Sequence, residues 1–284
     1  MGPHSRSAMP KPEDKFRKQH PAFWAHVKLI SENLGYSKSG KLKRYTTSEI
    51  LACLESQSVA TSHLYKESKL TDQGILLKRY LDYRAQLLED VVRVNLMDKE
   101  AARKLFEETC GKYNPKCKLP MNKQKGEKRH PAYLTGVVNT LTEAFLKGQS
   151  FDDEPRNLIR ITRESAVLRT LSRWMDGAYP STRNPIAVWE VKEYYGTKTF
   201  GSRVADGVYE TMLDGFEFQE LHEHEGIHVQ HYLIVDDYYT WWDCGKSYLC
   251  RIVDMMHMGL VDEVLFGREV VKRWPEIVTS WITK

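Results

Sequence analysis

The sequence lacks any apolar run long enough to cross a lipid bilayer, and its first twelve residues contain no apolar segment like that of a secretory leader. We therefore expect no membrane insertion, and we expect residues 1–12 to be a disordered start or a cloning remnant outside the fold. The five cysteines are odd in number and include no Cys-x-x-Cys pair. This argues against a disulfide framework or a zinc ribbon and favours a reducing cytoplasmic location.

The chain also lacks a strong overall charge, because 42 lysines and arginines oppose 38 aspartates and glutamates, for a formal net charge of +4. Positive charge is instead concentrated locally, which matters more for a polyanionic partner than the total does. A chain of 284 residues can bury a full core as one large domain or as two parts. We predict two parts, a helical N-terminal region over 13–150 and a second domain over 151–284.

The N-terminal region opens with two predicted helices joined by a basic loop. Apolar side chains recur at helical spacing over 22–33, and Gly35 stands where a C-cap glycine is expected. The sequence Thr46-Thr47-Ser48-Glu49 is a capping box that starts a second helix. This unit is either a small DNA-contacting module or a packed helical pair with a solvated loop. Its candidate contact residues are Lys41, Lys43 and Arg44.

Two further segments of this region are long and charged. The apolar stripe over 71–109 predicts one long helix and a shorter one after Asp98, either as a scaffold or as an interface between protomers. The segment 116–130 holds six lysines or arginines against one acid and contains proline and glycine, which predicts an exposed loop. Such a loop contacts DNA phosphates without sequence preference, or it is merely soluble. The candidates for phosphate contact are Lys123, Lys125, Lys128 and Arg129.

The most informative stretch is 184–195, in which a proline opens a run of β-forming apolar residues. The pattern is typical of a buried central strand, except that Glu190 and Lys192 lie at its far end. Because residues i and i+2 of a strand point to the same face, these two side chains are expected to project into one site. A carboxylate that holds a divalent ion, beside a lysine that orients water, is what phosphodiester hydrolysis requires.

A second carboxylate is available in Asp176, which precedes Glu190 by thirteen intervening residues that contain no other acid. If the chain between them doubles back as a hairpin, both carboxylates converge on one ion. The main-chain carbonyl of Val191 is then a candidate third ligand.

Asp176, Glu190 and Lys192 resemble the motif of the PD-(D/E)XK nuclease superfamily, in particular of type II restriction endonucleases, in which an aspartate and a spacer precede acid-x-lysine. The resemblance covers about 157–274, and it departs from the pattern where Met175 replaces the proline before the aspartate. It implies an α/β restriction-endonuclease-like core, with a central mixed sheet flanked by helices.

The resemblance also implies a helix before the catalytic hairpin, which we place at 160–174 and in which Glu164 supplies another acid. The implied activity is Mg²⁺-dependent, site-specific cleavage of double-stranded DNA by a homodimer.

The segment after the strand contains a loop with Lys198, Ser202 and Arg203, which either position phosphate and read a guanine edge or form a turn with a helix N-cap. A helix is predicted next. Its acids at steps of four, Asp206, Glu210 and Asp214, are expected to form a solvated face rather than a metal site. The histidines from His222 to His231 resemble a zinc site in spacing, but the alternation that follows favours a half-exposed strand.

Two rival interpretations remain open. One keeps the nuclease core but makes it a structure-directed or RNA-directed effector. The other is a non-catalytic DNA-binding protein in which Glu190 and Lys192 merely pair. A charge pair buried in an apolar strand is seldom more stabilising than apolar residues, which favours a catalytic role.

Overall fold

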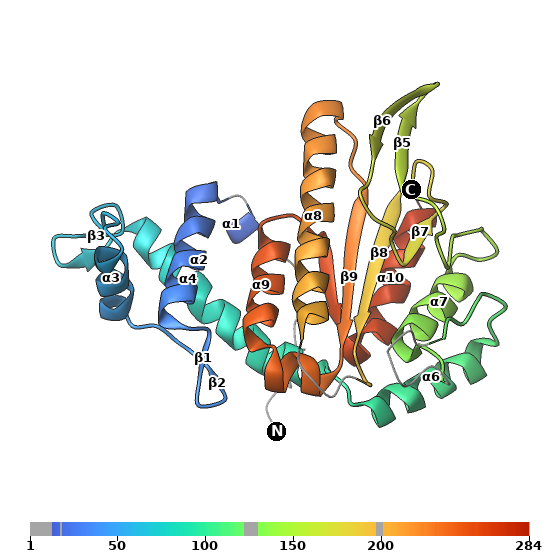
Figure 1. Cartoon of the computed structure of the whole chain (residues 1–284), viewed down its shortest axis with the longest axis horizontal. Helices are drawn as coiled ribbons and strands as arrows, with labels where there is room; N and C mark the ends of the chain where they lie inside the picture. Colours follow the sequence, from blue (N-terminus) through green and yellow to red (C-terminus); the bar gives the residue numbers. More distant parts are fainter. Residues whose placement is uncertain (1–12, 18, 122–129, 197–200, 284) are drawn as a thin grey trace.

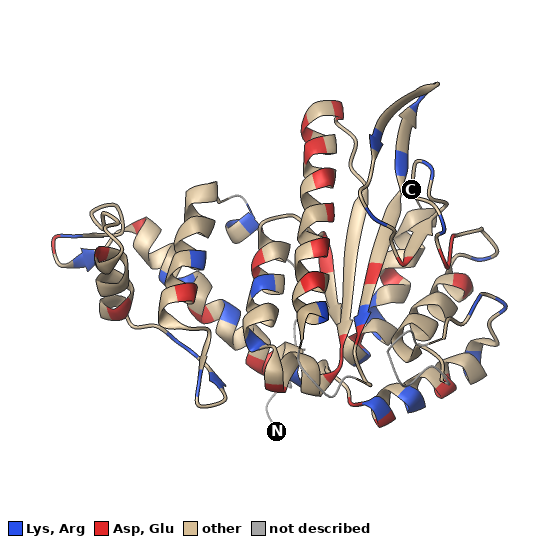
Figure 2. Cartoon of the chain, viewed as in Figure 1, with Lys and Arg blue, Asp and Glu red and all other residues tan. Residues whose placement is uncertain are grey.

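The computed structural model describes residues 13–17, 19–121, 130–196 and 201–283, so the predictions for 1–12 and for Lys123, Lys125, Lys128, Arg129 and Lys198 lie outside the described residues. The N-terminal region consists of helices separated by two small hairpins (Figure 1). Both hairpins carry lysines (Figure 2). In chain order the elements are α1 (Asp14–Arg17), α2 (Pro21–Leu34), β1 (Ser37–Lys38), β2 (Lys41–Leu42), α3 (Thr47–Ser56), β3 (Tyr65–Lys66), β4 (Lys69–Leu70) and α4 (Asp72–Leu87).

Local signals in this region have the predicted effect. Gly35 ends α2 with a φ of 80°, a conformation that a residue with a Cβ rarely adopts. Thr46 and Glu49 form the capping box of α3, with the Glu49 amide donating to Thr46 Oγ1 at 3.2 Å and the Thr46 amide donating to Glu49 Oε2 at 2.8 Å. The basic stretch between these helices is not a plain loop, because it contains the β1–β2 hairpin.

The long predicted helix is also confirmed. α4 continues through a π-turn (Leu88–Val92) into α5 (Arg93–Asn95), and Asp98 then caps α6 (Lys99–Tyr113) by accepting from the Ala101 amide at 2.8 Å. α7 (Tyr133–Phe145) follows.

The C-terminal half is organised around a mixed four-stranded sheet with the order β10-β9-β8-β7. β7 and β8 form an antiparallel hairpin, whereas β8, β9 and β10 are parallel and are connected by helices. The elements are β7 (Gly177–Tyr179), β8 (Ala187–Glu193), α8 (Ser202–Glu225), β9 (Gln230–Asp236), a π-turn (Tyr238–Cys244), α9 (Lys246–His257), β10 (Glu263–Phe266), a 3-10 turn (Gly267–Glu269) and α10 (Val270–Ile282).

Helices cover both faces of this sheet. On β9, Leu233 and Val235 pack in one cluster with α8 and α9, while Tyr232 and Ile234 pack in another with α6, α7 and α10. This alternation is the two-residue period of a strand buried on both sides. The predicted α/β architecture, a mixed sheet flanked by helices and preceded by a helical region, is therefore confirmed. The described helices include none that is both long and apolar enough to span a membrane.

The predicted helix over 160–174 is wrong. This stretch forms an antiparallel hairpin of β5 (Arg160–Arg163) and β6 (Ala166–Thr170), with Glu164 in its turn at a φ of 54°. Pairing with a distant segment helps to fix the extended form, since the Arg160 amide donates to Thr182 O at 2.9 Å. Ile161 then packs with Val188 in a separate small core. Tertiary contacts therefore overrode a weak helical pattern.

A buried ion pair joins the N-terminal region to the sheet domain. Arg84 on α4 donates from Nη1 to both carboxylate oxygens of Asp254 on α9, at 3.0 and 2.8 Å. Tyr80 donates to the same carboxylate at 2.5 Å, and Arg84 Nη2 donates to Ser31 on α2 at 2.8 Å. The helices α2, α4 and α9 are thereby joined through one buried ion pair. The charge of the Asp254 carboxylate is matched by Arg84, and its oxygens accept hydrogen bonds from Arg84 and Tyr80.

We predict that Asp254→Ala lowers the free energy of unfolding by about 3–5 kcal/mol, because it leaves the Arg84 guanidinium buried without a carboxylate. Urea denaturation measures this loss. The matched control is Glu100→Ala, which removes the exposed partner of Arg103 and should leave the midpoint nearly unchanged. Equal effects of the two changes would contradict the role given to the buried pair.

Candidate active site

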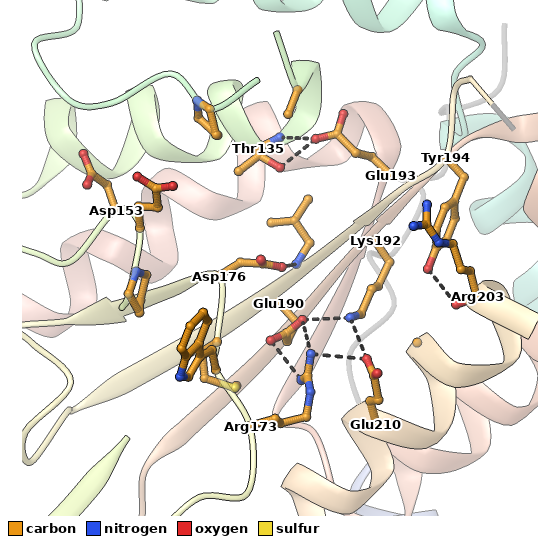
Figure 3. A pocket seen from close by; sticks show the side chains of 18 of the residues that line it. Thr135, Asp153, Arg173, Asp176, Glu190, Lys192, Glu193, Tyr194, Arg203 and Glu210 are labelled. Carbon is orange, nitrogen blue, oxygen red and sulfur yellow. Dashed lines mark hydrogen bonds and ion pairs between the residues drawn. The ribbon is translucent and has the colours of Figure 1, made fainter. Parts of the chain in front are cut away.

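The predicted residues Asp176, Glu190 and Lys192 lie together at the open end of the β7–β8 hairpin, where β7 begins beside the carboxyl-terminal half of β8 (Figure 3). Glu190 is only 1% exposed, and Lys192 Nζ lies 2.9 Å from its Oε2, as the i, i+2 spacing on a strand predicts. Asp176 immediately precedes β7, where its Oδ2 accepts from the Val191 amide at 2.8 Å. The hairpin thus brings the two carboxylates to one place.

Two other predicted residues have different positions. Glu164 lies in the exposed turn of the β5–β6 hairpin and is not among the residues that line the cleft, so its predicted place in a helix beside the site is wrong. Val191 lies at the site, but the contact the structure gives it there is the donation of its amide to Asp176. Metal ligation by the Val191 carbonyl stays a prediction.

Sequence reasoning missed the cation at the centre of the site, Arg173. Its guanidinium donates from Nη2 to Glu190 Oε2 at 3.3 Å and from Nη1 to Asp214 Oδ2 at 2.6 Å. Its Nη2 also lies 3.3 Å from Glu210 Oε2. Because Arg173 was assigned to the last turn of a helix predicted over 160–174, no sequence signal pointed to this role.

The acidic side of α8 faces the site. Asp206 and Glu210 are exposed there, as expected, but the expectation of a solvated position is wrong for Asp214. Asp214 is fully buried, and Glu210 Oε2 lies 3.5 Å from Lys192 Nζ. Gly207 allows this approach, because a Cβ there would come within 2.9 Å of the Tyr194 hydroxyl. At Gly215 a Cβ would lie 2.5 Å from the Leu260 carbonyl oxygen. The glycines beside the acids were the available signal that α8 packs closely.

The site holds four carboxylates, Asp176, Glu190, Glu210 and Asp214, against the two cations Arg173 and Lys192. Burial, reinforced by the charge of Glu190, raises the pKa of Asp176 and of Asp214 to about 7. Burial alone would also raise the pKa of Glu190, but Lys192 and Arg173 outweigh it and hold that pKa below its usual value. Conversely, Glu190 and Asp176 keep the pKa of Lys192 above its usual value despite burial, so Lys192 is a cation at neutral pH.

Two buried oxygens of this cluster accept no hydrogen bond, namely Glu190 Oε1 and Asp214 Oδ1. Arg173 Nη1 lies 3.0 Å from Glu190 Oε1, which is an ion-pair distance without hydrogen-bond geometry. An excess of carboxylates with an unsatisfied oxygen is suited to a cation, and Mg²⁺ characteristically uses one or two carboxylates together with water and substrate oxygens. Within the described ranges, no group of three or more histidine, cysteine or acidic residues is arranged to hold a metal.

The cleft around these residues has a volume of about 540 Å³, and its lining combines charged with apolar side chains. One wall is formed by the start of α8, where Arg203 lies; its carbonyl accepts from the Tyr194 hydroxyl at 3.2 Å. Ser202 is the first residue of α8. The opposite wall includes Thr135 and Asp153, and Trp174 lies beside Arg173 with 56% of its surface exposed. A volume of this size is within the range of ligand-binding clefts.

The remaining predicted contact residues lie in the N-terminal region. Lys43 pairs with Glu49 at 3.4 Å and donates to the Leu34 carbonyl at 3.1 Å. Arg44 pairs with Glu89 at 3.3 Å, whereas Lys41 is exposed on the β1–β2 hairpin. Two of the three side chains therefore already have partners within the chain.

Comparison with known proteins assigns the sheet and its flanking helices to one family. Residues 97–281 match the family described as a domain of unknown function, DUF7687. The chain belongs to this family. Residues 10–91 match a second domain of unknown function, DUF7690. Neither the curated proteins nor the solved structures contain a match.

The DUF7687 match includes the whole cleft and begins at α6, so the family models divide the chain at 91–97, whereas the sequence analysis drew its boundary near 150. The Arg84–Asp254 pair connects the two matched regions.

Within the DUF7687 domain we predict that Arg173→Met lowers the free energy of unfolding by about 3 kcal/mol at pH 8. The loss should be smaller at pH 6. Without Arg173, the pKa of Asp214 rises further, so the folded variant binds a proton that the unfolded chain does not, and stability falls as pH rises. Urea denaturation at both pH values measures this. Arg169→Met, which removes the partner of the exposed Glu220, is the control and should show little change at either pH.

Proposed function

We propose that this chain is a Mg²⁺-dependent endonuclease of the PD-(D/E)XK type that hydrolyses phosphodiester bonds of double-stranded DNA. The observation that carries the proposal is the convergence of Asp176, Glu190 and Lys192 on one open cleft at the end of a β-hairpin. Their order in the sequence, with Asp176 directly before one strand and Glu190 and Lys192 on the adjacent strand, matches the superfamily motif. The parallel connection from β8 through α8 to β9 further supports a restriction-endonuclease-like core.

In this proposal Asp176 and Glu190 hold the metal ion. When bound, Mg²⁺ supplies positive charge that offsets the charge developing on the phosphate and lowers the pKa of water. Lys192 is held by Glu190, and because it remains protonated it acts as a hydrogen-bond donor that orients the attacking water and the phosphate. The water oxygen attacks phosphorus in line and gives up a proton to solvent, while the bond from phosphorus to the leaving sugar oxygen breaks and that oxygen takes a proton from solvent.

Two departures from the superfamily pattern shape the proposal. Met175 stands in place of the proline, and the segment expected to supply a helical acid forms a hairpin instead. Glu164 is therefore removed from the proposed site. Glu210 takes the supporting position, since it reaches both Lys192 and Arg173 from the helix that follows β8.

The proposed partners are double-stranded DNA and a second copy of the chain. Ser202 and Arg203 lie in the first turn of α8, where main-chain amides favour phosphate. α8 also exposes Tyr209, Leu213 and Phe216, a helically spaced apolar stripe that a second protomer could cover. Five free cysteines suit the reducing cytoplasm that we propose as its location.

The second candidate class is a DNA-binding protein without catalysis. The observation in its favour is that Arg173 already neutralises Glu190 and Asp214, so the cluster is partly satisfied as it stands. A nuclease directed to RNA or to branched DNA uses the same residues as the first proposal. Cleavage assays separate these candidates.

We predict that the protein cleaves duplex DNA in Mg²⁺ but not in EDTA. Glu190→Gln and Lys192→Met should each lower the rate at least about 100-fold, because one removes a metal ligand and the other removes the donor to the nucleophile. Glu164→Gln is the matched control and should retain full activity. Gel analysis of the products measures the cleavage rates of the wild type and the three variants.

Discrete fragments would indicate a site-specific restriction-type enzyme, and ragged degradation would indicate a nuclease of broader specificity. Cleavage confined to RNA or branched DNA would show that this class, and not ordinary duplex DNA, is the substrate. If every substrate stays intact while DNA is bound, the catalytic proposal is wrong and the binding protein replaces it.

We predict that Mg²⁺ raises the melting temperature of the wild-type protein at pH 8 relative to EDTA, because a ligand that binds only the folded state stabilises it. Asp176→Asn should abolish this shift and yet be at least as stable as wild type in EDTA. The raised pKa of Asp176 means that its ionised form is unfavourable in the folded protein, and an asparagine oxygen can still accept from the Val191 amide. An unchanged Mg²⁺ response in Asp176→Asn would contradict the assignment.

A further inference from the structure

The region matched by DUF7690 contains the same small structure twice. Each of its hairpins pairs two residues with two others across a two-residue turn. Both turn residues have a positive φ, at Ser39 (51°) and Gly40 (76°) in the first hairpin and at Glu67 (52°) and Ser68 (62°) in the second. Turns of this kind match the twist of a hairpin, but positive φ disfavours side chains other than glycine. The chain thus accepts some backbone strain to form two tight tips.

Both hairpins are held at their base by an equivalent contact. The Lys43 amide donates to the Tyr36 carbonyl, and the Thr71 amide donates to the Leu64 carbonyl, each at 3.0 Å. The second hairpin also packs closely against α4, because a Cβ at Gly74 would lie only 2.1 Å from the Leu64 carbonyl oxygen. The tips are therefore held in place relative to the helices behind them.

Each tip carries two lysines directly opposite one another. The registered pairs are Lys38 with Lys41 and Lys66 with Lys69, and all four side chains are exposed. Like charges in this position destabilise a hairpin. In the described part of the chain, the one ion pair formed by these lysines joins Lys66 to the equally exposed Glu67, at 3.8 Å. Two strained turns with four exposed lysines, three of which have no ion pair within the described residues, are best explained by an anionic partner.

The charge of the cleft explains why a separate surface is needed to bind a polyanion. Among the described residues, seven acidic ones line the cleft against three basic ones, Arg173, Lys192 and Arg203, so this surface does not itself attract a polyanion. The affinity for DNA must come from elsewhere. In Figures 1 and 2 the β1–β2 hairpin projects toward the same lower edge as the start of α8, and the β3–β4 hairpin projects from the far left end.

We propose that the two hairpins, together called the clamp, bind the phosphate backbone of duplex DNA outside the cleft at two separate points. This inference rests on the proposed function, which makes DNA the substrate. The Cα atoms of opposed residues are about 5 Å apart, so each tip presents two ammonium groups to a strand that carries one charge per about 3.4 Å. The tips are polar and one contains Glu67, so they have neither the apolar anchor nor the uniform charge that suits an anionic membrane.

The test is fluorescence anisotropy of a labelled 30-base-pair duplex (a length of about 100 Å at 3.4 Å per pair), titrated with the full-length protein in EDTA at several NaCl concentrations. EDTA prevents cleavage from affecting the measurement. The variants are K38A/K41A, K66A/K69A and the combination of all four. Binding should weaken in each pair, and the slope of log affinity against log salt should fall by about one for each lysine that contacts a phosphate.

The control is K104A/K272A, which removes the same charge from exposed positions on α6 and α10 and should leave the slope nearly unchanged. Thermal melts verify that all variants fold equally well. If the hairpin variants bind DNA like the control, the clamp proposal is wrong. It is also wrong if the same lysines govern binding to phosphatidylserine vesicles while DNA binding is unaffected.

The experiments distinguish failure of the clamp proposal from failure of the nuclease proposal. Salt-sensitive binding that depends on the hairpin lysines, without any Mg²⁺-dependent cleavage, supports the clamp and rejects the nuclease. Cleavage that continues with unchanged affinity in the four-lysine variant rejects the clamp alone.

Discussion

The burial of one carboxylate, Glu190, governs the arrangement around it. It lies in the middle of β8, a strand covered by helices on both faces, so its carboxylate is removed from water and requires positive partners. Lys192 supplies one from the same strand, and Arg173 supplies another from the segment before β7. Arg173 also pairs with the buried Asp214, which requires α8 to approach closely, and glycines in that helix permit the approach. The cleft is the open side of this network.

Charge of opposite sign is distributed over different parts of the chain. The cleft has more carboxylates than cations, a composition suited to a metal ion, while exposed lysines lie on hairpins of the N-terminal region. The Arg84–Asp254 pair fixes that region to the sheet domain, so the hairpins and the cleft keep a fixed position relative to each other. A division of this kind lets long-range attraction of a polyanion coexist with a locally negative site.

Local chemistry explains most of the fold that the sequence predicted. The capping box at Thr46, the C-cap at Gly35 and the strand that contains Glu190 depend on neighbouring residues, so they are visible without a structure. The stretch 160–174 was misassigned because its pattern suits helix and strand about equally. Its extended form depends on pairing with Thr182 and on packing against Val188, both remote in sequence.

The sequence by itself determined that Glu190 and Lys192 share a face, because alternation along a strand is a local property. It also indicated Asp176, since a short chain that doubles back leaves few other acids within reach. Only the tertiary structure decided that Arg173 joins them, that Asp214 is buried rather than solvated, and that Glu164 lies away from the site. The Arg173–Asp214 contact spans 41 residues and forms only when α8 packs on the sheet, which no local pattern encodes.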